Sequence, residues 1–526
     1  MRSFYTTAGI FFGIAVIYII MMLSGTDYYF TYILDDAYIH LAMAKNFALY
    51  GVWGITPYAF SSSSSSPLFT FLLSGFIYVF GNHYWIPLFF NMVLSLFVIF
   101  FLVKYYRFYL NKNKYIIAGA LFTVFFAVLH FQVFTGMEHV LQILVIVINI
   151  YCFQKWITSR FNNSAMQTGF YVTIALLGLI RFESMFYFVS LILMFILLKK
   201  WAKAVGVLVL GFIPILIFGY FNEQQSGYFF PNSVVVKGTT FDFSGNYLLQ
   251  VKHLLVDKML LNITFYKIVF FPLVISLLLI YRDYKKKLNY KEILVNNFLL
   301  IAWTLTMILH SLFGDLKGFR YEAYLLVALC MLLIPRLKDF LGSPGIMMRK
   351  DPLMGLLIVF NIILMVYKVG YAHIMIIKGS ENIYTQQVQS AKFLKEYYNT
   401  SKVVANDIGA ICYFSDIHLF DIAGLGSAET IRFNEKEKIF DDEFESFVSQ
   451  YTRDNHYQLA IVYEEWFSGH VPASWKKVAV LKINGNINVA LDHVCIYAVD
   501  PNISDDLKKN IRKFNWHKNV KVTFMR

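Results

Sequence analysis

The sequence predicts a polytopic α-helical membrane protein that ends in a small C-terminal α/β domain. Hydrophobic residues make up 58% of the 526 residues and charged residues only 15%, and apolar runs recur until about residue 372. Runs of this length are typical of membrane-spanning helices. From about residue 380, helical stretches alternate with β-branched runs, which is typical of an α/β domain. We therefore expect a transmembrane module over 1–375 and an α/β domain over 380–526.

The apolar runs predict about eleven transmembrane helices. The first run, 8–24, lacks a small-x-small cleavage site, so we expect it to remain as a span. The stretch Ser66 to Gly81 is apolar but too short to cross, and it predicts a juxtamembrane helix within a first outer loop over 25–84. The other spans are predicted at 85–103, 115–131, 138–153, 168–180, 183–198, 204–221, 264–281, 293–312, 321–335 and 353–371.

Basic residues indicate which loops face the cytoplasm. The net charge of +13 lies in short clusters between the apolar spans, which is typical of membrane anchors and not of a nucleic-acid-binding surface. With the N-terminus inside, the cytoplasmic segments hold 19 Lys and Arg, and the outward segments before the tail hold eight. This asymmetry predicts a multi-pass membrane protein whose N-terminus is cytoplasmic and whose C-terminal domain is extracytoplasmic.

The tail contains four strand candidates and two helix candidates. The strands are expected in KVVAND, QLAIVYEE, KKVAVLKI and HVCIYAVD, and the helices in QQVQSAKFLKEYY and DDEFESFVSQYTRD. Cys412 and Cys495 also lie here, and outside the cytoplasm they could form a bridge or remain two buried thiols. No cysteine or histidine spacing is typical of a metal site.

Unusual polar residues collect at the outward ends of the predicted spans. Ionisable groups at the membrane edge are costly unless they pair or face water, so this placement predicts one polar cavity on the outer side. Arg181 with Glu183, and Arg320 with Glu322, could instead be plain ion pairs at the ends of spans, without a role in such a cavity. Lys237 could simply extend its ammonium to the membrane interface. The residues are Asp35, Asp36, His40, Glu138, Arg181, Glu183, Asn232, Lys237, Arg320, Tyr321 and Glu322.

The adjacent carboxylates Asp35 and Asp36 have two interpretations. Asp36 and His40 share a helix face, whereas Asp35 points about 100° away. A carboxylate on such a face could take the proton of an acceptor hydroxyl as a general base. Either aspartate could instead cap the N–H groups of the helix that begins here. The spacing alone leaves both interpretations open.

Six motifs follow one another in an order known from one superfamily. They are the first-loop set DDAYIHLAMAKN, GVWG and SSSPLF, then TGMEH, RFES, GYFFPNSVVVKG, FRYEAYL and the tail segment VVANDIGAICYFSDIHLFDIAGLGS. Together they resemble the C-fold membrane glycosyltransferases (the GT-C superfamily), and in particular bacterial members of the arabinofuranosyltransferase-like branch. Ala42 and Lys45 stand where relatives often carry Arg, so the contacts to a donor phosphate are expected to differ. Phe182 stands where relatives usually carry Pro.

The resemblance implies an inverting glycosyltransferase that transfers a hexosyl or pentosyl group. The donor would be a polyprenyl-phosphate-linked sugar, and the acceptor an envelope glycan, lipid or protein on the outer face of the bacterial cytoplasmic membrane. Asp35 or Asp36 would be the base, and Arg320, Lys237 and Arg181 would stabilise the departing phosphate, with Arg320 first. Glu138 would position the acceptor or a partner cation, and the other residues of the polar set would bind substrate.

The resemblance requires no cofactor, and no Walker or glycine-rich phosphate loop is present. A divalent cation could be held by the two carboxylates and a phosphate oxygen. The expected partners are the donor lipid, the acceptor and membrane lipids, with no nucleic acid.

A membrane transporter or lipid flippase is the alternative from another class. It would place ionisable residues in interrupted helices and often in repeated halves, and the sequence shows neither. An assembly scaffold without chemistry is a third interpretation, which loss of activity on substitution of an aspartate would separate from an enzyme.

Overall fold

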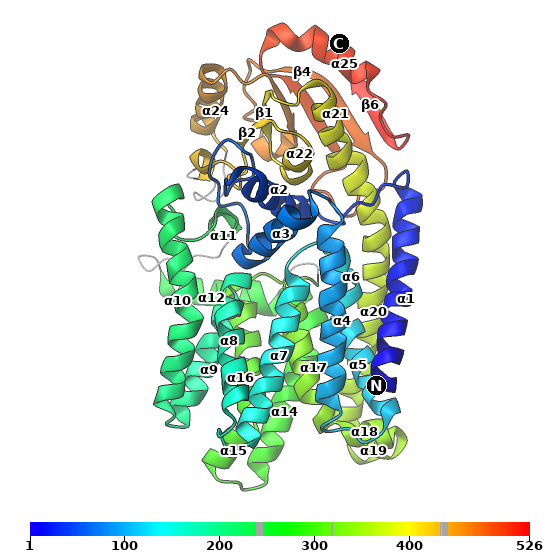
Figure 1. Ribbon diagram of the computed structural model, residues 1–526, viewed down its shortest axis with the longest axis vertical. Coiled ribbons are helices and arrows are strands. Elements are labelled where there is room, and N and C mark those ends of the chain that lie inside the picture. Colours follow the sequence, from blue (N-terminus) through cyan, green and yellow to red (C-terminus); the bar gives the residue numbers. More distant parts are fainter. Residues whose placement is uncertain (238–245, 317–318, 432, 434–439, 526) are drawn as a thin grey trace.

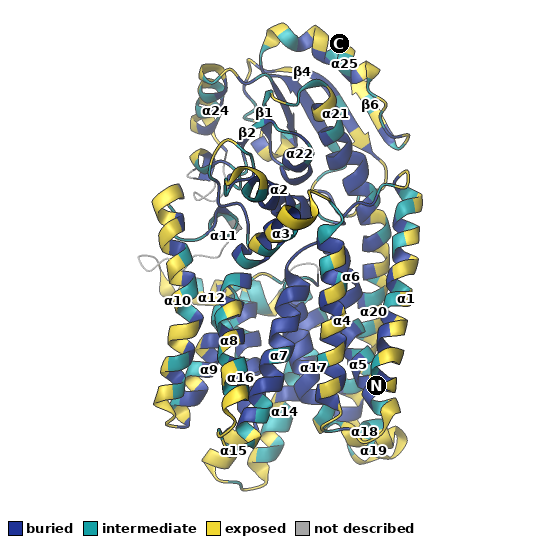
Figure 2. Cartoon of the chain, viewed as in Figure 1, coloured by how far each residue is buried: buried dark blue, intermediate teal, exposed yellow. Residues whose placement is uncertain are grey.

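The computed structural model describes residues 1–237, 246–316, 319–431, 433 and 440–525, without the side chains of Ser226 and Lys237. Figure 1 shows a long helical bundle with a sheet domain at one end and the first outer loop between them. Exposed apolar residues follow the outer faces of the bundle, for example Ile20, Leu216 and Phe221, which are 62%, 54% and 63% exposed. Such a surface is matched by lipid and not by water, as expected for membrane helices (Figure 2).

Each predicted span coincides with helical structure. Six helices are long and apolar enough to cross a membrane, or up to eight if each bent pair is one span, so the count of eleven stays a prediction. The bundle helices are α1 (Arg2–Gly25), α4 (Ile86–Tyr106), α5 (Asn113–Phe126), α6 (Leu129–Thr135), α7 (His139–Thr158), α8 (Ser164–Ile180), α9 (Ser184–Leu197), α10 (Trp201–Ser226), α14 (Phe271–Lys285), α16 (Phe298–Phe313), α17 (Ala323–Arg336) and α20 (Pro352–Ile383). Shorter connections are α11 (Asn232–Lys237), α12 (Tyr247–Lys252), η1 (His253–Leu260), α13 (Ile263–Phe265), η2 (Tyr266–Phe270), α15 (Tyr290–Asn296), α18 (Lys338–Gly342) and α19 (Pro344–Lys350).

Two helices are interrupted, which corrects the expectation from the sequence. α5 and α6 bend by 44° at their junction, and α15 and α16 bend by 74°. At the first break Val128 has a left-handed backbone, with φ 46°. A β-branched residue rarely adopts this conformation, and no glycine or proline marks the break, so the sequence carried no signal for it.

The first outer loop holds two helices, α2 (Asp36–Tyr50) and α3 (Pro67–Phe80). α3 begins with a proline at its first position and forms the predicted juxtamembrane helix. α2 ends at Gly51, whose φ of 69° is the left-handed conformation that glycine adopts freely. Every residue of α2 from Ala37 to Asn46 is buried. This helix is therefore packed on all sides between the bundle and the tail (Figure 1).

The tail is the predicted small α/β domain. α20 continues through η3 (Tyr384–Val388) into α21 (Gln389–Tyr397), and a six-stranded mixed sheet follows in the order β2-β1-β3-β5-β4-β6. β1 (Lys402–Ala405) pairs in parallel with β2 (His418–Asp421) and β3 (Leu459–Val462), whereas β4 (Lys476–Ile483), β5 (His493–Ala498) and β6 (Val520–Phe524) join antiparallel. The four predicted strands are present, and β2 and β6 were missed. The other tail helices are α22 (Gly409–Phe414), η4 (Ala428–Thr430), α24 (Asp442–Asp454), η5 (Glu464–Phe467), η6 (Pro501–Ile503) and α25 (Ser504–Lys513).

Cys412 and Cys495 are both buried free thiols, so no bridge joins them. Cys412 lies on α22 and Cys495 on β5.

Candidate active site

A cavity of about 360 Å³ lies between the first outer loop, the facing ends of the bundle helices and one residue of the tail, Leu425. One part of its wall is polar, formed by Asp36, His40, Arg181, Glu183, Asp315 and Tyr321. Another part is apolar, formed by Phe182, Met185, Phe186, Phe230, Val234 and Phe313. The arrangement suits a ligand with a charged group and an apolar portion.

Asp36 is the first residue of α2 and its carboxylate faces this cavity. Its Oδ2 accepts from Arg320 Nη1 at 3.0 Å, and a quarter of its side chain remains exposed. The segment before Arg320 is held by the interrupted helix α6, because Gln132 Nε2 donates to the carbonyl of Phe319 at 2.7 Å. The break in the bundle therefore contributes to placing the cation opposite Asp36.

Asp35 is turned away from the cavity, towards the tail. Its Oδ2 accepts from the backbone N–H of Gly409 at 2.6 Å and its Oδ1 from that of Ala410 at 2.8 Å. Gly409 lies so close that a Cβ there would be 2.2 Å from the Asp35 carbonyl oxygen. Burial and then the nearby Asp407 raise the pKa of Asp35, and the two N–H donors oppose that rise. The two adjacent carboxylates thus point in different directions: Asp36 faces the cavity, and Asp35 binds the tail.

Lys45 holds the other end of α22. Its Nζ donates to the carbonyl of Tyr413 at 3.1 Å and of Cys412 at 3.4 Å, and it lies 3.3 Å from Asp416 Oδ1. A carboxylate at the first N–H groups and an ammonium at the last carbonyls both complement the helix dipole. Asp35 and Lys45, at the start and in the middle of α2, therefore bind the two ends of α22. The resemblance implied a contact between position 45 and the donor phosphate, but Lys45 contacts the tail.

A fully buried glutamate, Glu138, organises the polar wall. Its Oε1 accepts from Arg181 Nη1 at 2.6 Å, and its Oε2 lies 3.2 Å from His40 Nε2. Arg181 also donates from Nε to Glu183 Oε2 at 3.1 Å and pairs with that carboxylate a second time. Arg181 thus has two carboxylate partners, which largely balance its charge.

Tyr321 brings the two arginines to the same wall. The guanidinium carbons of Arg181 and Arg320 lie 4.6 and 4.8 Å from its ring centroid. Both distances allow a cation–π interaction. Tyr321 and Arg181 line the cavity, whereas Arg320 does not line it and is connected to it by its contact with Tyr321 and its pair with Asp36.

The remaining predicted residues lie around this centre. Asn232 joins the loops, because its backbone N–H donates to Ser62 at 2.9 Å and its Nδ2 to the carbonyl of Leu425 at 3.2 Å. Glu322 is fully buried at the start of α17 and does not line the cavity. Lys237 ends α11, and its side chain lies outside the described residues.

The serine run at 61–66 belongs to the site, although the sequence showed it only as a low-complexity segment. Ser65 Oγ donates to Glu138 Oε1 at 3.1 Å, and Ser64 Oγ lies 3.1 Å from His40 Nδ1. Ser63 and Ser65 line the cavity. The only signal was the adjacent SSSPLF motif, which gave no role to single serines.

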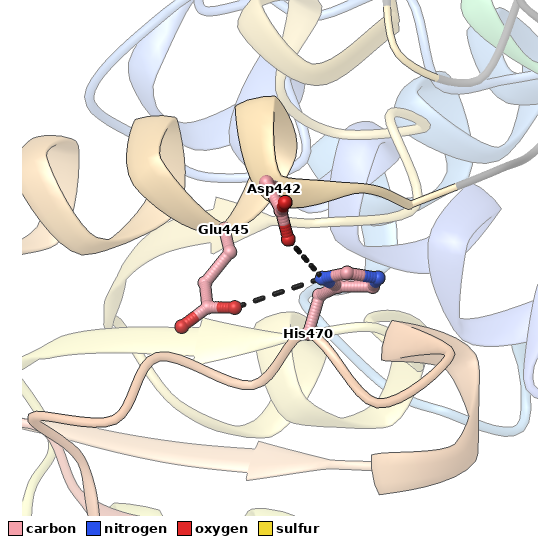
Figure 3. A group of neighbouring side chains, drawn as sticks. All are labelled: Asp442, Glu445 and His470. Carbon is pink, nitrogen blue, oxygen red and sulfur yellow. Dashed lines mark ion pairs between the residues drawn. The ribbon is translucent and has the colours of Figure 1, made fainter.

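The described residues contain one group with metal-ligand spacing, and it lies on the tail. Figure 3 shows Asp442 and Glu445 of α24 pointing towards the ring of His470. The distances from His470 Nδ1 to their oxygens are 3.3 and 3.6 Å, and the Asp442 side chain is 99% exposed. A histidine beside the acidic first turn of a helix explains this group without an ion. Asp35 and Asp36 direct their oxygens to different partners and do not fit a shared cation, so we derive no step through one.

No curated protein matches this chain in sequence at a significant level. A family described as a domain of unknown function (DUF8728) matches residues 381–497, within the tail. Among solved structures, the crystal structure of ArnT from Cupriavidus metallidurans bound to undecaprenyl phosphate matches over 95% of this chain and 99% of the ArnT chain, with a TM-score of 0.52 and 10% identity. The chain has the fold of ArnT. This confirms the predicted GT-C-like fold of a polytopic helical membrane protein with a small C-terminal sheet.

Proposed function

We propose that this protein is an inverting glycosyltransferase that moves a sugar from a polyprenyl-phosphate donor to an envelope glycan, lipid or protein acceptor. The reaction takes place on the outer face of the bacterial cytoplasmic membrane, with 1–375 as the catalytic module and 380–526 as the extracytoplasmic domain. The observation that carries the proposal is the pair of Asp36 and Arg320, 3.0 Å apart, in which Asp36 lines a cavity that is polar on one part of its wall and apolar on another, whereas Arg320 does not itself line the cavity. The shared fold supports it, because ArnT was crystallised with undecaprenyl phosphate.

Asp36 is the general base in this mechanism. It takes the proton from the acceptor hydroxyl, whose oxygen forms a bond to the anomeric carbon from the face opposite the phosphate. The bond between that carbon and the phosphate oxygen breaks, and the electron pair leaves with the polyprenyl phosphate. One displacement of this kind inverts the anomeric configuration.

Arg320 stabilises the charge that develops on the departing phosphate. It is better suited than Arg181, because Arg181 already has Glu138 and Glu183 as partners. A phosphate that binds Arg320 competes with Asp36 for the guanidinium, and a carboxylate that loses a cation becomes a stronger base. Donor binding would thus prepare Asp36 for the proton transfer. Arg181, Glu138, Glu183 and His40 then shape the wall against which the sugar is placed.

Asp35 is a positioning residue and not the base. Its two oxygens hold the start of α22, and it precedes Asp36 directly in the chain. Docking of the tail therefore fixes the backbone from which Asp36 reaches the cavity. Asn232 and Leu425 extend the same connection from the tail to the cavity rim.

The interrupted helices are the one observation that favours the alternative, a transporter or lipid flippase. The break at Val128 has a use in the transferase as well, because α6 beyond it holds Phe319 next to Arg320. The two functions differ in their product. A flippase leaves the donor lipid chemically unchanged, whereas the transferase consumes it.

Replacement of Arg320 tests the proposal. Purified full-length protein in vesicles would be given a polyprenyl-phosphate-linked sugar, and release of polyprenyl phosphate would be measured for the wild type, Arg320→Lys and Arg320→Ala. Lys keeps the charge but loses the planar fork, so both variants should fall well below the wild type and Ala furthest. Arg453→Ala is the matched control, because that side chain is 76% exposed on the tail. Near-normal release by Arg320→Ala would remove Arg320 from the site.

A further inference from the structure

A second cavity, of about 660 Å³, lies on a part of the tail that the proposed reaction does not use. It is formed where α21 meets the segment between α25 and β6, next to the end of α1. Figure 1 shows α21 continuing from α20, with the end of α1 beside this helix. Its main lining residues are Asp27, Tyr384, Lys392, Lys395, Trp516 and Lys518.

The edge of this cavity at Asp27 is expected at the level of the lipid headgroups, just beyond the outer end of α1. α1 has 24 residues, which corresponds to about 36 Å of helix and exceeds the roughly 30 Å hydrocarbon core. Asp27 follows the end of α1 by two residues, and the neighbouring Tyr28 is 85% exposed. Exposed tyrosine and partly buried tryptophan beside a span are typical of the membrane interface.

Three lysines from two segments face this cavity without carboxylate partners. Lys392 Nζ lies 4.2 Å from the ring centroid of Tyr29, 4.8 Å from that of Tyr384 and 3.3 Å from the Tyr384 hydroxyl oxygen. Within the described ranges, no ion pair within 4.0 Å joins a carboxylate to Lys392, Lys395 or Lys518, and Asp27 acts on Lys392 from a greater distance. Burial lowers the pKa of Lys392, and Asp27 opposes that change. A bound anion would offset the cost of this partly desolvated cation.

The acidic residues of the cavity offset this positive charge only in part. Asp27 is directed to His517, whose Nε2 is 3.5 Å from its Oδ1, and to the Tyr384 hydroxyl at 3.4 Å. Glu396 is exposed at the rim. The cations on α21 and at Lys518 therefore remain available to a ligand, and the aromatic wall suits the carbon part of a headgroup.

We propose that this cavity binds the phosphate headgroup of an anionic phospholipid from the outer leaflet. Lys392, Lys395 and Lys518 hold the phosphate, and Trp516 with Tyr384 packs against the glycerol portion. The location at the end of a span favours a lipid over a soluble ligand, because the lipid is already present at this level. The site would fix the tail on the membrane surface.

Electron paramagnetic resonance of spin-labelled lipids tests the proposal. Full-length protein would be reconstituted in phosphatidylcholine vesicles with a trace of labelled phosphatidylglycerol or labelled phosphatidylcholine, and the motionally restricted fraction would be measured. We expect the wild type to prefer labelled phosphatidylglycerol over labelled phosphatidylcholine by about tenfold or more, since each lysine near the surface raises the affinity for an anionic lipid roughly fivefold. The triple variant Lys392→Gln, Lys395→Gln, Lys518→Gln should lose this preference.

The control replaces three exposed lysines elsewhere on the proposed outer side, Lys252, Lys476 and Lys509, by glutamine and should keep the preference. Lys392→Arg should keep it too, and this variant separates loss of charge from misfolding. Inorganic phosphate at 10 mM (about the highest useful concentration) should not displace the labelled lipid if the lipid headgroup is the ligand. Full displacement by phosphate, equal restriction of both lipids by the wild type, or a retained preference in the triple variant would each overturn the proposal.

Discussion

Replacing Asp36 and Asp35 by asparagine, one at a time, separates the two roles assigned to the adjacent carboxylates. Asp36→Asn keeps the size of the side chain but cannot accept the acceptor proton, so sugar transfer should fall by about 10²-fold or more. The Asp36 and Arg320 side chains are only 25% and 13% exposed, and the asparagine oxygen can still accept from Arg320, so the substitution should change the stability of the protein by about 1–3 kcal/mol. The tail should stay docked in this variant.

Asp35→Asn should give the opposite pattern. An amide offers one acceptor oxygen, so either the Gly409 or the Ala410 N–H would face the NH₂ group instead of an oxygen. A buried donor left without an acceptor costs about 1–3 kcal/mol, which corresponds to a roughly 5- to 150-fold larger population with an undocked tail. Limited proteolysis at residues after 397 should therefore accelerate, and transfer should fall less than in Asp36→Asn.

The assay measures polyprenyl phosphate release and tail proteolysis on the same reconstituted samples. Asp505→Asn, an exposed aspartate of α25, is the matched control and should change neither. The reasoning is refuted if Asp35→Asn abolishes transfer with a protease-resistant tail while Asp36→Asn transfers at near wild-type rate.

The remaining predictions concern the tail, its pH dependence and its orientation. Gly409→Ala should reproduce the proteolysis of Asp35→Asn, because its Cβ would lie 2.2 Å from the Asp35 carbonyl oxygen, and additive effects of the two changes would contradict a shared contact. Burial raises the pKa of Asp421 to about 6 against the N–H donors of Gly426 and Ala423, so its native state binds a proton that the unfolded state releases near pH 4. The wild type should lose about 2 kcal/mol relative to Asp421→Asn as the pH rises from 4 to 7, seen as a falling difference in thermal midpoint, and a pH-independent difference would contradict this. An alkaline phosphatase fusion after residue 400 should be active, and an inactive fusion at normal expression would reverse the proposed topology.

Much of the architecture could be predicted because membrane insertion and sheet formation leave strong periodic signals. Each predicted span coincides with helical structure, and the four β-branched runs of the tail are strands. β2 was missed because HLFD is short and mixed in character, and β6 because VKVTF lies among charged residues at the end of the chain. The bend at Val128 was missed because no glycine or proline marks it in the sequence.

The sequence predicted several residues of the cavity wall, whereas the predicted Asp35, Glu138 and Arg320 do not line it, and the long-range partners were not predicted. The polar residues at the outer ends of the spans predicted one cavity, and Asp36, His40, Arg181, Glu183 and Tyr321 line it. The roles of the other residues depend on contacts between residues far apart in the sequence. The acceptor of two tail N–H groups lies 374 and 375 positions away from them, and no local pattern distinguishes such a carboxylate from its neighbour.

The same limit applies to Lys45, whose partners on α22 lie more than 360 positions away. The serine run is a similar case, since its hydroxyls acquire roles only when α3 places them against Glu138 and His40.

The central claim, that this protein consumes a polyprenyl-phosphate-linked sugar, is tested most directly by the lipids of the cell. Lipid extracts of a deletion strain would be compared by mass spectrometry with those of the same strain carrying the wild type or Asp36→Asn. We predict that an unused polyprenyl-phosphate-sugar accumulates in the deletion strain and with Asp36→Asn, and disappears with the wild type. Identical polyprenyl-phosphate-sugar levels in all three strains would contradict the account.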